Sequence, residues 1–153
     1  MSLTLNQTVP NFTAAATSNQ QVALTALQGK KLVLYFYPKD STPGCTTQGG
    51  NFRDLYNEFQ AANTEIFGIS RDSLKSHEKF KAKQSYPFEL ISDEDEALCQ
   101  LFDVLKLKKL FGKEYMGIER STFLIDETGK LVKEWRKVKV AGHVQAVLAA
   151  VKS

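Results

Sequence analysis

The stretch that decides the fold is Leu32–Arg53, with the sequence LVLYFYPKDSTPGCTTQGGNFR. It begins with an apolar run of β-branched, aliphatic and aromatic residues, which is typical of a buried central strand. Pro38 has no backbone N–H to donate to a neighbouring strand, so we expect the strand to end there. Thr42 and Pro43 then predict the start of a helix, because a hydroxyl residue is favoured at the N-cap and proline at the first helical position.

Cys45 falls in the first turn of this predicted helix. The helix dipole favours an anion at that position, so the thiolate of Cys45 should form more readily than that of a free cysteine. A lone cysteine is often only a small buried hydrophobe, but a place at a Pro-Gly helix entrance, between threonines, favours reactivity. Gln48, one turn later, is either a polar neighbour of the site or an exposed residue. The stretch therefore predicts thiolate chemistry at Cys45.

The rest of the chain alternates predicted strands with predicted helices and ends with an antiparallel pair, which indicates an α/β fold with a mixed sheet. At 153 residues, we expect one domain spanning residues 1–153. Residues 104–113, rich in Leu and Lys, are expected to form an irregular loop. The other expected elements are a polar hairpin within 11–24, helices from 43 to about 62, from 73 to 84, after 92 or 93, and at 142–151, and strands at 65–70, 88–91, 115–118, 120–125 and 131–138.

Composition narrows the class of protein. The hydrophobic fraction of 42% and the charged fraction of 24% are ordinary for a soluble protein, and a net charge of +3 is too small to indicate nucleic-acid binding. The N-terminus lacks the basic start and apolar core of a signal peptide, and no stretch approaches the length of a membrane span. Two cysteines cannot build a disulfide framework, so we expect a reducing cytoplasm. Since no Cys/His cluster has metal-ligand spacing, we expect no metal site, and His77 and His143 are interpreted as surface or capping residues.

The spacing Pro38-x-x-x-Thr42-x-x-Cys45 resembles that of the peroxiredoxins. The longer string YFYPK…TPGCT is similar to the bacterioferritin comigratory protein (PrxQ) branch of that family. Three further blocks extend the resemblance over nearly the whole chain: Gly68–Asp72, Ser92–Cys99 and Gly117–Asp126. The resemblance implies a thioredoxin-like fold, with a central mixed β-sheet flanked by helices and an N-terminal β-hairpin.

The same resemblance implies a thiol-dependent peroxidase, an antioxidant oxidoreductase of cell redox homeostasis. Its redox-active cysteine would be Cys45, which attacks one oxygen of hydrogen peroxide or an organic hydroperoxide and becomes a sulfenic acid. No cofactor is implied, because sulfur carries the redox change without a metal, haem or flavin. Thioredoxin, glutaredoxin or a small thiol would return the sulfur to its reduced form. A monomer is expected, with no nucleic acid or membrane as partner.

The resemblance also implies a role for each residue of this chain that matches the family motif. The hydroxyl of Thr42 would bond both the thiolate and the incoming peroxide, and Pro38 would shield the cysteine from water. Arg120, in the string Glu-Arg-Ser-Thr-Phe, matches the family arginine that stabilises the thiolate and the charge that develops on the leaving oxygen. The backbone amides of Gly44 and Cys45 would bind the peroxide oxygens at the helix entrance.

This sequence departs from the family where a second, resolving cysteine is often found. One usual position, five residues after the reactive cysteine, holds Gly50, and another, in the next helix, matches Lys81. Cys99 is the only other thiol, and its neighbours Leu98, Leu101 and Phe102 favour a buried structural role. We therefore expect a one-cysteine mechanism with an external thiol. The alternatives are a two-cysteine mechanism in which Cys99 resolves, a redox-sensing or chaperone module, and a thioredoxin-type reductase, which lacks its Cys-x-x-Cys pair here.

Overall fold

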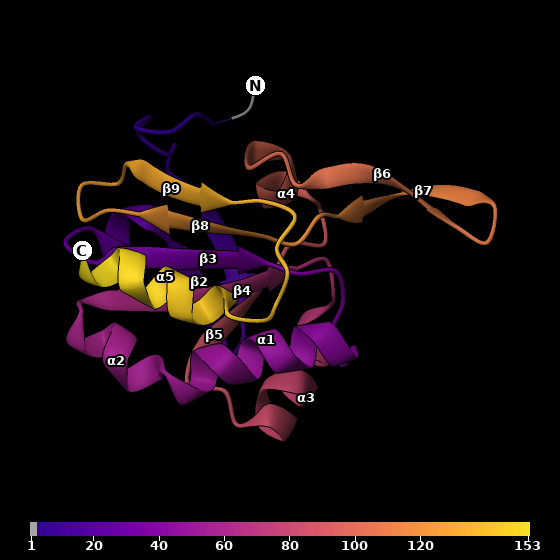
Figure 1. Ribbon diagram of the computed structural model, residues 1–153, viewed down its shortest axis with the longest axis horizontal. Helices are drawn as coiled ribbons and strands as arrows, with labels where there is room; N and C mark the ends of the chain where they lie inside the picture. The colour runs from indigo at the N-terminus through magenta and orange to yellow at the C-terminus, as the bar shows by residue number, and fades with distance from the viewer. Residues whose placement is uncertain (1–2) are drawn as a thin grey trace.

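The computed structural model describes residues 3–153 and has a mixed β-sheet at its centre (Figure 1). Within these residues the sheet has seven strands in the order β2-β1-β5-β4-β3-β8-β9. Strands β3, β4 and β5 are parallel, whereas β8, β9, β1 and β2 join the sheet by antiparallel pairing. The strands are β1 (Thr13–Ala16), β2 (Gln20–Ala23), β3 (Lys31–Phe36), β4 (Thr64–Ser70), β5 (Glu89–Ser92), β8 (Ser121–Ile125) and β9 (Leu131–Trp135). The predicted α/β class and the N-terminal hairpin are thus confirmed.

Two hydrophobic cores lie on opposite faces of the sheet, because β3 is buried on both sides. Val33 and Tyr35 belong to one core, and Leu32, Leu34 and Phe36 to the other. The first core is covered by α1 (Pro43–Asp54), α2 (Tyr56–Ala61), α3 (Leu74–Gln84) and α5 (His143–Lys152). The second is covered by α4 (Ala97–Leu101), the short 3-10 helix η1 (Leu24–Leu27) and the N-terminal segment. No helix among the described residues combines the length and the apolar character that crossing a bilayer requires.

The helix that follows Cys45 is not continuous, so the prediction of one helix to about Ala62 is wrong. Leu55 leaves helical geometry at φ −103° and ψ 7°, and a second helix, α2, begins after it. The first helix is intrinsically weak, since each internal glycine costs about 1 kcal/mol relative to alanine and α1 contains a pair of them. The break leaves Phe52 and Phe59 both fully buried in the core.

The prediction of an irregular loop at residues 104–113 is also wrong, because most of this segment forms a strand. Residues of the 104–113 stretch form β6 (Leu105–Leu110), which pairs antiparallel with β7 (Lys113–Ile118) as a separate two-stranded hairpin. The alternation of Leu and Lys in β6 has the period of a strand, and the two residues Phe111 and Gly112 make the turn. The hairpin projects away from the body of the molecule, as Figure 1 shows.

The remaining boundaries differ by smaller amounts. β9 ends at Trp135 rather than near Val138, and α4 is only five residues long. Its N-cap is Glu96, while Asp93 accepts hydrogen bonds from the amides of Leu98 and Cys99 in its first turn. The sequence allows Asp72 or Ser73 as the cap of α3, and the structure has Ser73, whose hydroxyl accepts a hydrogen bond from the amide of Ser76.

Candidate active site

Cys45 lies in the first turn of α1, beyond the carboxyl end of β3, and only 2% of it is exposed. Thr42 occupies the predicted N-cap in extended geometry, and Pro43 is the first helical residue. The hydroxyl of Thr42 donates to the carbonyl oxygen of Lys39 at 2.8 Å and does not cap the helix. Half-buried Pro38 separates β3 from the loop that carries these residues.

The entrance of α1 presents two backbone donors next to the sulfur. The first intrahelical bond runs from the amide of Thr46 to the carbonyl of Thr42, so the amides of Gly44 and Cys45 precede the helical ladder. Among the described residues, neither amide has a hydrogen-bond acceptor. Amides at a helix N-terminus attract an anion, which suits both a thiolate and a peroxide oxygen.

Arg120 is brought to Cys45 by the pairing of β8 with β3. The register sets Phe36 opposite Ser121, so Arg120 lies at the edge of the sheet where β3 ends. Its Nη2 donates to the Sγ of Cys45 at 3.4 Å, and its Nη1 donates to the Oε1 of Gln48 at 2.6 Å. A guanidinium held in this way stabilises a thiolate by charge and by hydrogen bonding.

Gln48 and Gly44 make this contact possible. Gln48 is completely buried, so the option that it is merely exposed is wrong, and its Nε2 has no hydrogen-bond partner within residues 3–153. A Cβ atom at Gly44 would lie 3.1 Å from the Nη2 of Arg120. The absence of a side chain at Gly44 thus allows the guanidinium to approach the helix entrance closely.

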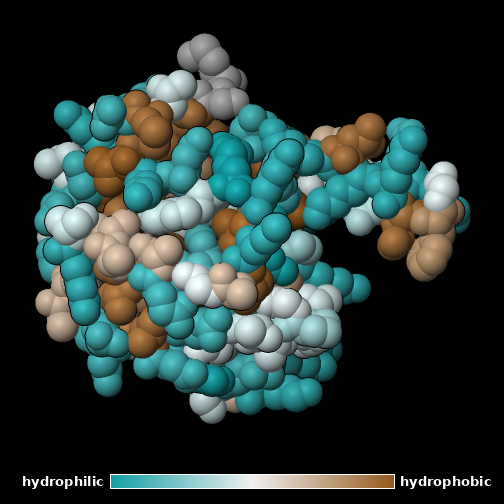
Figure 2. Space-filling view, viewed as in Figure 1, coloured by the Kyte–Doolittle hydropathy of each residue, from teal (hydrophilic) through white to brown (hydrophobic). Residues whose placement is uncertain are grey.

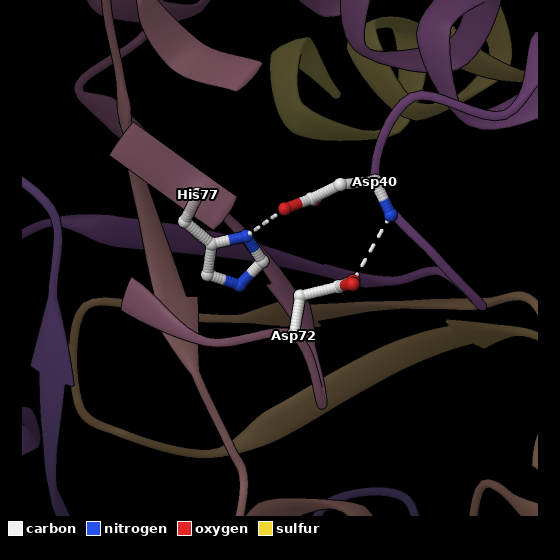
Figure 3. A group of neighbouring side chains, drawn as sticks. All are labelled: Asp40, Asp72 and His77. Carbon is white, nitrogen blue, oxygen red and sulfur yellow. Dashed lines mark hydrogen bonds and ion pairs between the residues drawn. The ribbon is translucent and has the colours of Figure 1, made fainter. Parts of the chain in front are cut away.

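A buried polar cluster beneath the loop anchors the segment between Pro38 and Thr42 (Figure 3). The carboxylate of Asp40 contacts the Nδ1 of His77 at 2.7 Å and accepts hydrogen bonds from the hydroxyls of Tyr37 and Ser76, both at 2.7 Å. The backbone amide of Asp40 donates to the Oδ2 of Asp72 at 2.9 Å. The cluster joins the loop that precedes α1 to α3 and to the end of β4.

The hydrogen bonds of His77 determine where a proton lies in this cluster. Its Nε2 is 3.0 Å from the carbonyl oxygen of Ile91, which can only accept, so Nε2 carries a hydrogen. Its Nδ1 faces a carboxylate oxygen of Asp40 across 2.7 Å, and two lone pairs cannot face each other at that distance. One further proton is therefore shared between His77 and Asp40, in a site that is closed to solvent.

The interpretation of both histidines as surface or capping residues is wrong. His77 is completely buried, and His143 is 6% exposed with its Nε2 at 2.8 Å from the hydroxyl of Thr122. Burial, followed by the nearby charge of Arg120, lowers the pKa of His143 to about 4.

Ligand atoms of Asp40, Asp72 and His77 lie within 4.8 Å of one another, but hydrogen bonds inside the cluster already engage them. Sequence spacing missed this cluster because its members come from three separate elements.

Cys99 lies in α4 with none of its surface exposed, as expected. Burial is the main cause that raises the pKa of its thiol, and a hydrogen bond to Asp93 adds to the effect. Cys45 and Cys99 belong to the two different cores, so the central sheet separates them. Both cysteines are free.

Gly50 and Lys81 occupy the two positions at which the family resemblance would place a resolving cysteine. The Nζ of Lys81 lies 3.2 Å from a carboxylate oxygen of Glu89 and 3.1 Å from the hydroxyl of Ser18. These contacts hold α3 against β5 and the N-terminal hairpin. Gly50 lies in the middle of α1, where its nearest side-chain neighbour is the Nη2 of Arg53.

A cysteine at a helix N-terminus beside a guanidinium, on a fold of this architecture, defines an enzyme class that works by thiolate chemistry. Comparison with known proteins makes the class specific. The AhpC/TSA family matches residues 5–134. Peroxiredoxin Bcp of Xanthomonas campestris pv. campestris is 59% identical over 133 residues, covering 87% of this chain and 83% of the relative. Peroxiredoxin Bcp of Bacillus subtilis is 51% identical over 152 residues, covering 99% and 97%.

Solved structures of relatives indicate the same family as the sequence comparisons. The bacterioferritin comigratory protein of Xanthomonas campestris superposes with a TM-score of 0.88 at 55% identity, covering 92% of this chain and 90% of that one. The chain therefore belongs to the AhpC/TSA family, as a peroxiredoxin enzyme of the bacterioferritin comigratory protein (PrxQ) branch. The predicted thioredoxin-like fold is confirmed by the same relatives.

Proposed function

We propose that this peroxiredoxin reduces hydrogen peroxide and organic hydroperoxides at Cys45 by a one-cysteine mechanism with an external thiol. The observation that carries the proposal is the contact of 3.4 Å between the Nη2 of Arg120 and the Sγ of Cys45, at a helix entrance with two free amides. A relative of known structure supports the substrate class, since the Xanthomonas campestris protein is described by its alkyl peroxide reduction activity.

In the proposed reaction, the thiolate of Cys45 attacks the nearer oxygen of the peroxide and the O–O bond breaks. The sulfur gains a hydroxyl group and becomes a sulfenic acid, and the other oxygen leaves as water or an alcohol after it takes up a proton. Arg120 and the amides of Gly44 and Cys45 stabilise the charge that moves onto the leaving oxygen. Pro38 limits access of water to the sulfur.

Thr42 binds the peroxide in this proposal, although its hydroxyl hydrogen is engaged by Lys39. A hydroxyl donates once and accepts twice, so Thr42 still offers lone pairs to a peroxide O–H. A turn of the hydroxyl away from Lys39 would let it donate to the thiolate instead. Thr42 thus fits a role in orienting the substrate.

The one-cysteine mechanism is supported by the surroundings of the other candidates. Cys99 is buried beyond the central sheet, and its raised pKa disfavours the thiolate. Gly50 offers no sulfur, and Lys81 is paired with Glu89. The alternatives are a two-cysteine mechanism in which Cys99 resolves, and a module that senses peroxide or acts as a chaperone. We also propose a single domain over residues 1–153 that acts as a cytoplasmic monomer, without a cofactor.

Intact-mass analysis after one equivalent of peroxide, without reductant, tests the mechanism. We expect a gain of one oxygen atom located on Cys45, and no gain in the Cys45→Ser variant. An internal disulfide between Cys45 and Cys99 in most molecules would reject the one-cysteine mechanism. Excess peroxide should add a second oxygen to Cys45 and give the sulfinic acid. A stable complex with another protein and no turnover with a small thiol would favour the sensor.

A further inference from the structure

The hairpin of β6 and β7 projects from the body of the molecule (Figure 1), and hydrophobic residues gather on it (Figure 2). Five of the eight large hydrophobic side chains that are exposed among the described residues lie on it: Leu107, Leu110, Phe111, Tyr115 and Met116. Contiguous exposed apolar surface on a folded protein commonly marks a contact site for another molecule. The catalytic residues described above do not account for this hairpin.

The turn of the hairpin breaks a local sequence rule. Phe111 and Gly112 have φ angles of 52° and 76°, the pattern of a two-residue turn in which both residues are left-handed. Asn, Asp or Gly is favoured at the first of these positions, and a bulky residue there is strained. Phe111 is 95% exposed, so no packing within the chain offsets the strain. Such a conflict between sequence and local structure is expected at functional sites.

The hairpin is also strongly basic. It carries four lysines, Lys106, Lys108, Lys109 and Lys113, and the single acid Glu114. The net charge of the hairpin is therefore +3, the same as that of the whole chain. Lysines interleaved with exposed apolar side chains match an acidic partner that carries apolar surface.

One face of the hairpin borders the active site. Lys108 lies opposite Tyr115 and Leu110 opposite Lys113, so these four side chains share a face. The Nζ of Lys108 donates to the carbonyl of Ile118, two residues before Arg120. Burial, followed by the nearby charge of Arg120, lowers the pKa of Lys108. The opposite face holds Leu107 against Met116, and the Lys109–Glu114 ion pair.

The proposed reaction requires a thiol to reach Cys45. The thiolate of a dithiol attacks the sulfenic sulfur, an S–S bond forms, and the hydroxyl leaves as water after it takes up a proton. The second thiol of the same molecule then attacks the mixed disulfide, and this returns Cys45 as a thiol and leaves the reductant oxidised. A protein dithiol must rest on the surface around Cys45 during both steps.

We propose that the face formed by Lys108, Leu110, Lys113 and Tyr115, together with Phe111 at the tip, is the docking surface for an acidic protein dithiol. The proposal rests on the peroxidase function above and adds the partner of that site. Figure 2 shows a hollow between the hairpin and the body of the molecule, which a convex protein can enter. A flat bilayer would meet only the tip and would leave the rest of this face uncovered.

The test compares turnover driven by thioredoxin with turnover driven by dithiothreitol, which needs no docking surface. We expect Phe111→Ser and Leu110→Ser to raise the KM for thioredoxin about fivefold or more, as for a residue at the centre of an interface. Leu107→Ser is the matched control, because Leu107 and Leu110 are exposed leucines of one strand on opposite faces. Lys113→Glu should lower kcat/KM for thioredoxin and weaken its salt dependence, whereas Lys30→Glu, at the other end of β3, should not.

The rate with dithiothreitol should stay unchanged in all of these variants. Equal KM values for thioredoxin in Leu107→Ser and Leu110→Ser would overturn the proposal. It would also be overturned if dithiothreitol reduced the native protein and thioredoxin did not. Binding to phosphatidylglycerol vesicles that Phe111→Ser abolishes, with thioredoxin kinetics unchanged, would assign the tip to a lipid surface and also overturn it. Absence of turnover of the native protein with dithiothreitol would instead reject the peroxidase function itself.

Discussion

Replacing Arg120 with Met removes the guanidinium that contacts the Sγ of Cys45 while retaining a long, unbranched side chain. Two unit charges 3.4 Å apart interact by about 5 kcal/mol at an effective dielectric constant near 20, and by about 1 kcal/mol in bulk water. Cys45 is almost fully buried, which favours the larger value, but the two helix amides still stabilise the anion. We therefore expect the rate constant for peroxide to fall roughly 10²-fold to 10³-fold.

Stopped-flow measurement of a single oxidation of Cys45 gives this rate constant without any contribution from the reductant. Alkylation by iodoacetamide, measured in parallel, reports how much of the loss comes from a smaller thiolate fraction. Arg53→Met is the matched control, since Arg53 lies near the other end of the same helix and contacts the carbonyl of Gln84. A folded Arg120→Met variant that reacts within threefold of the native rate would show that this contact does not stabilise the transition state.

Three further predictions concern stability and the second thiol. Gly49→Ala should lower the free energy of unfolding by about 1 to 3 kcal/mol, because the added Cβ would clash with the Oη of buried Tyr86. In the control, Gly50→Ala, the added Cβ meets only the flexible end of the Arg53 side chain, so denaturant titration should show no change in stability. The pKa of His143 is about 4 in the folded protein and lies below its unfolded value, so the unfolded state binds more protons between pH 6.5 and 4. The free energy of unfolding should therefore fall by at most about 2 kcal/mol when the pH is lowered to 5. Chemical unfolding at pH 7 and at pH 5 measures this loss, which His143→Gln should reduce. Cys99→Ser should keep most of the turnover with dithiothreitol, and a loss as large as that of Cys45→Ser would contradict the one-cysteine mechanism.

Local patterns were sufficient for the fold and for the position of Cys45 in the first turn of a helix. The apolar run before Pro38 and the Thr-Pro helix start are properties of neighbouring residues, and the structure has β3 and α1 at those places. The expectation for residues 104–113 failed because frequent lysines were interpreted as a solvated loop. The alternation that decides between a loop and a strand becomes convincing only when the partner strand, Lys113–Ile118, is paired with it.

The buried pair of His77 and Asp40 could not be predicted from spacing, because three-dimensional packing alone brings the two residues together. His77 and Asp40 are 37 residues apart in sequence, and an isolated histidine in a polar helix has the pattern of an exposed residue. Its burial depends on the carbonyl of Ile91 and the carboxylate of Asp40, which satisfy both ring nitrogens. A buried polar group with any partner missing would cost several kcal/mol.

The same contacts hold the loop between Pro38 and Thr42 in place. Helix α3 binds the loop through the pair of His77 and Asp40, and binds the sheet edge through Lys81 and Glu89. At Lys81, a position that the family resemblance suggested for a resolving thiol, the side chain instead pairs with Glu89 and ties α3 to β5. An anchored α3 favours a loop that keeps one geometry through the oxidation of Cys45. Under the proposed one-cysteine mechanism, a sulfenic acid held in such a site would persist until an external thiol attacked it, and the basic hairpin is the surface proposed to receive the carrier of that thiol.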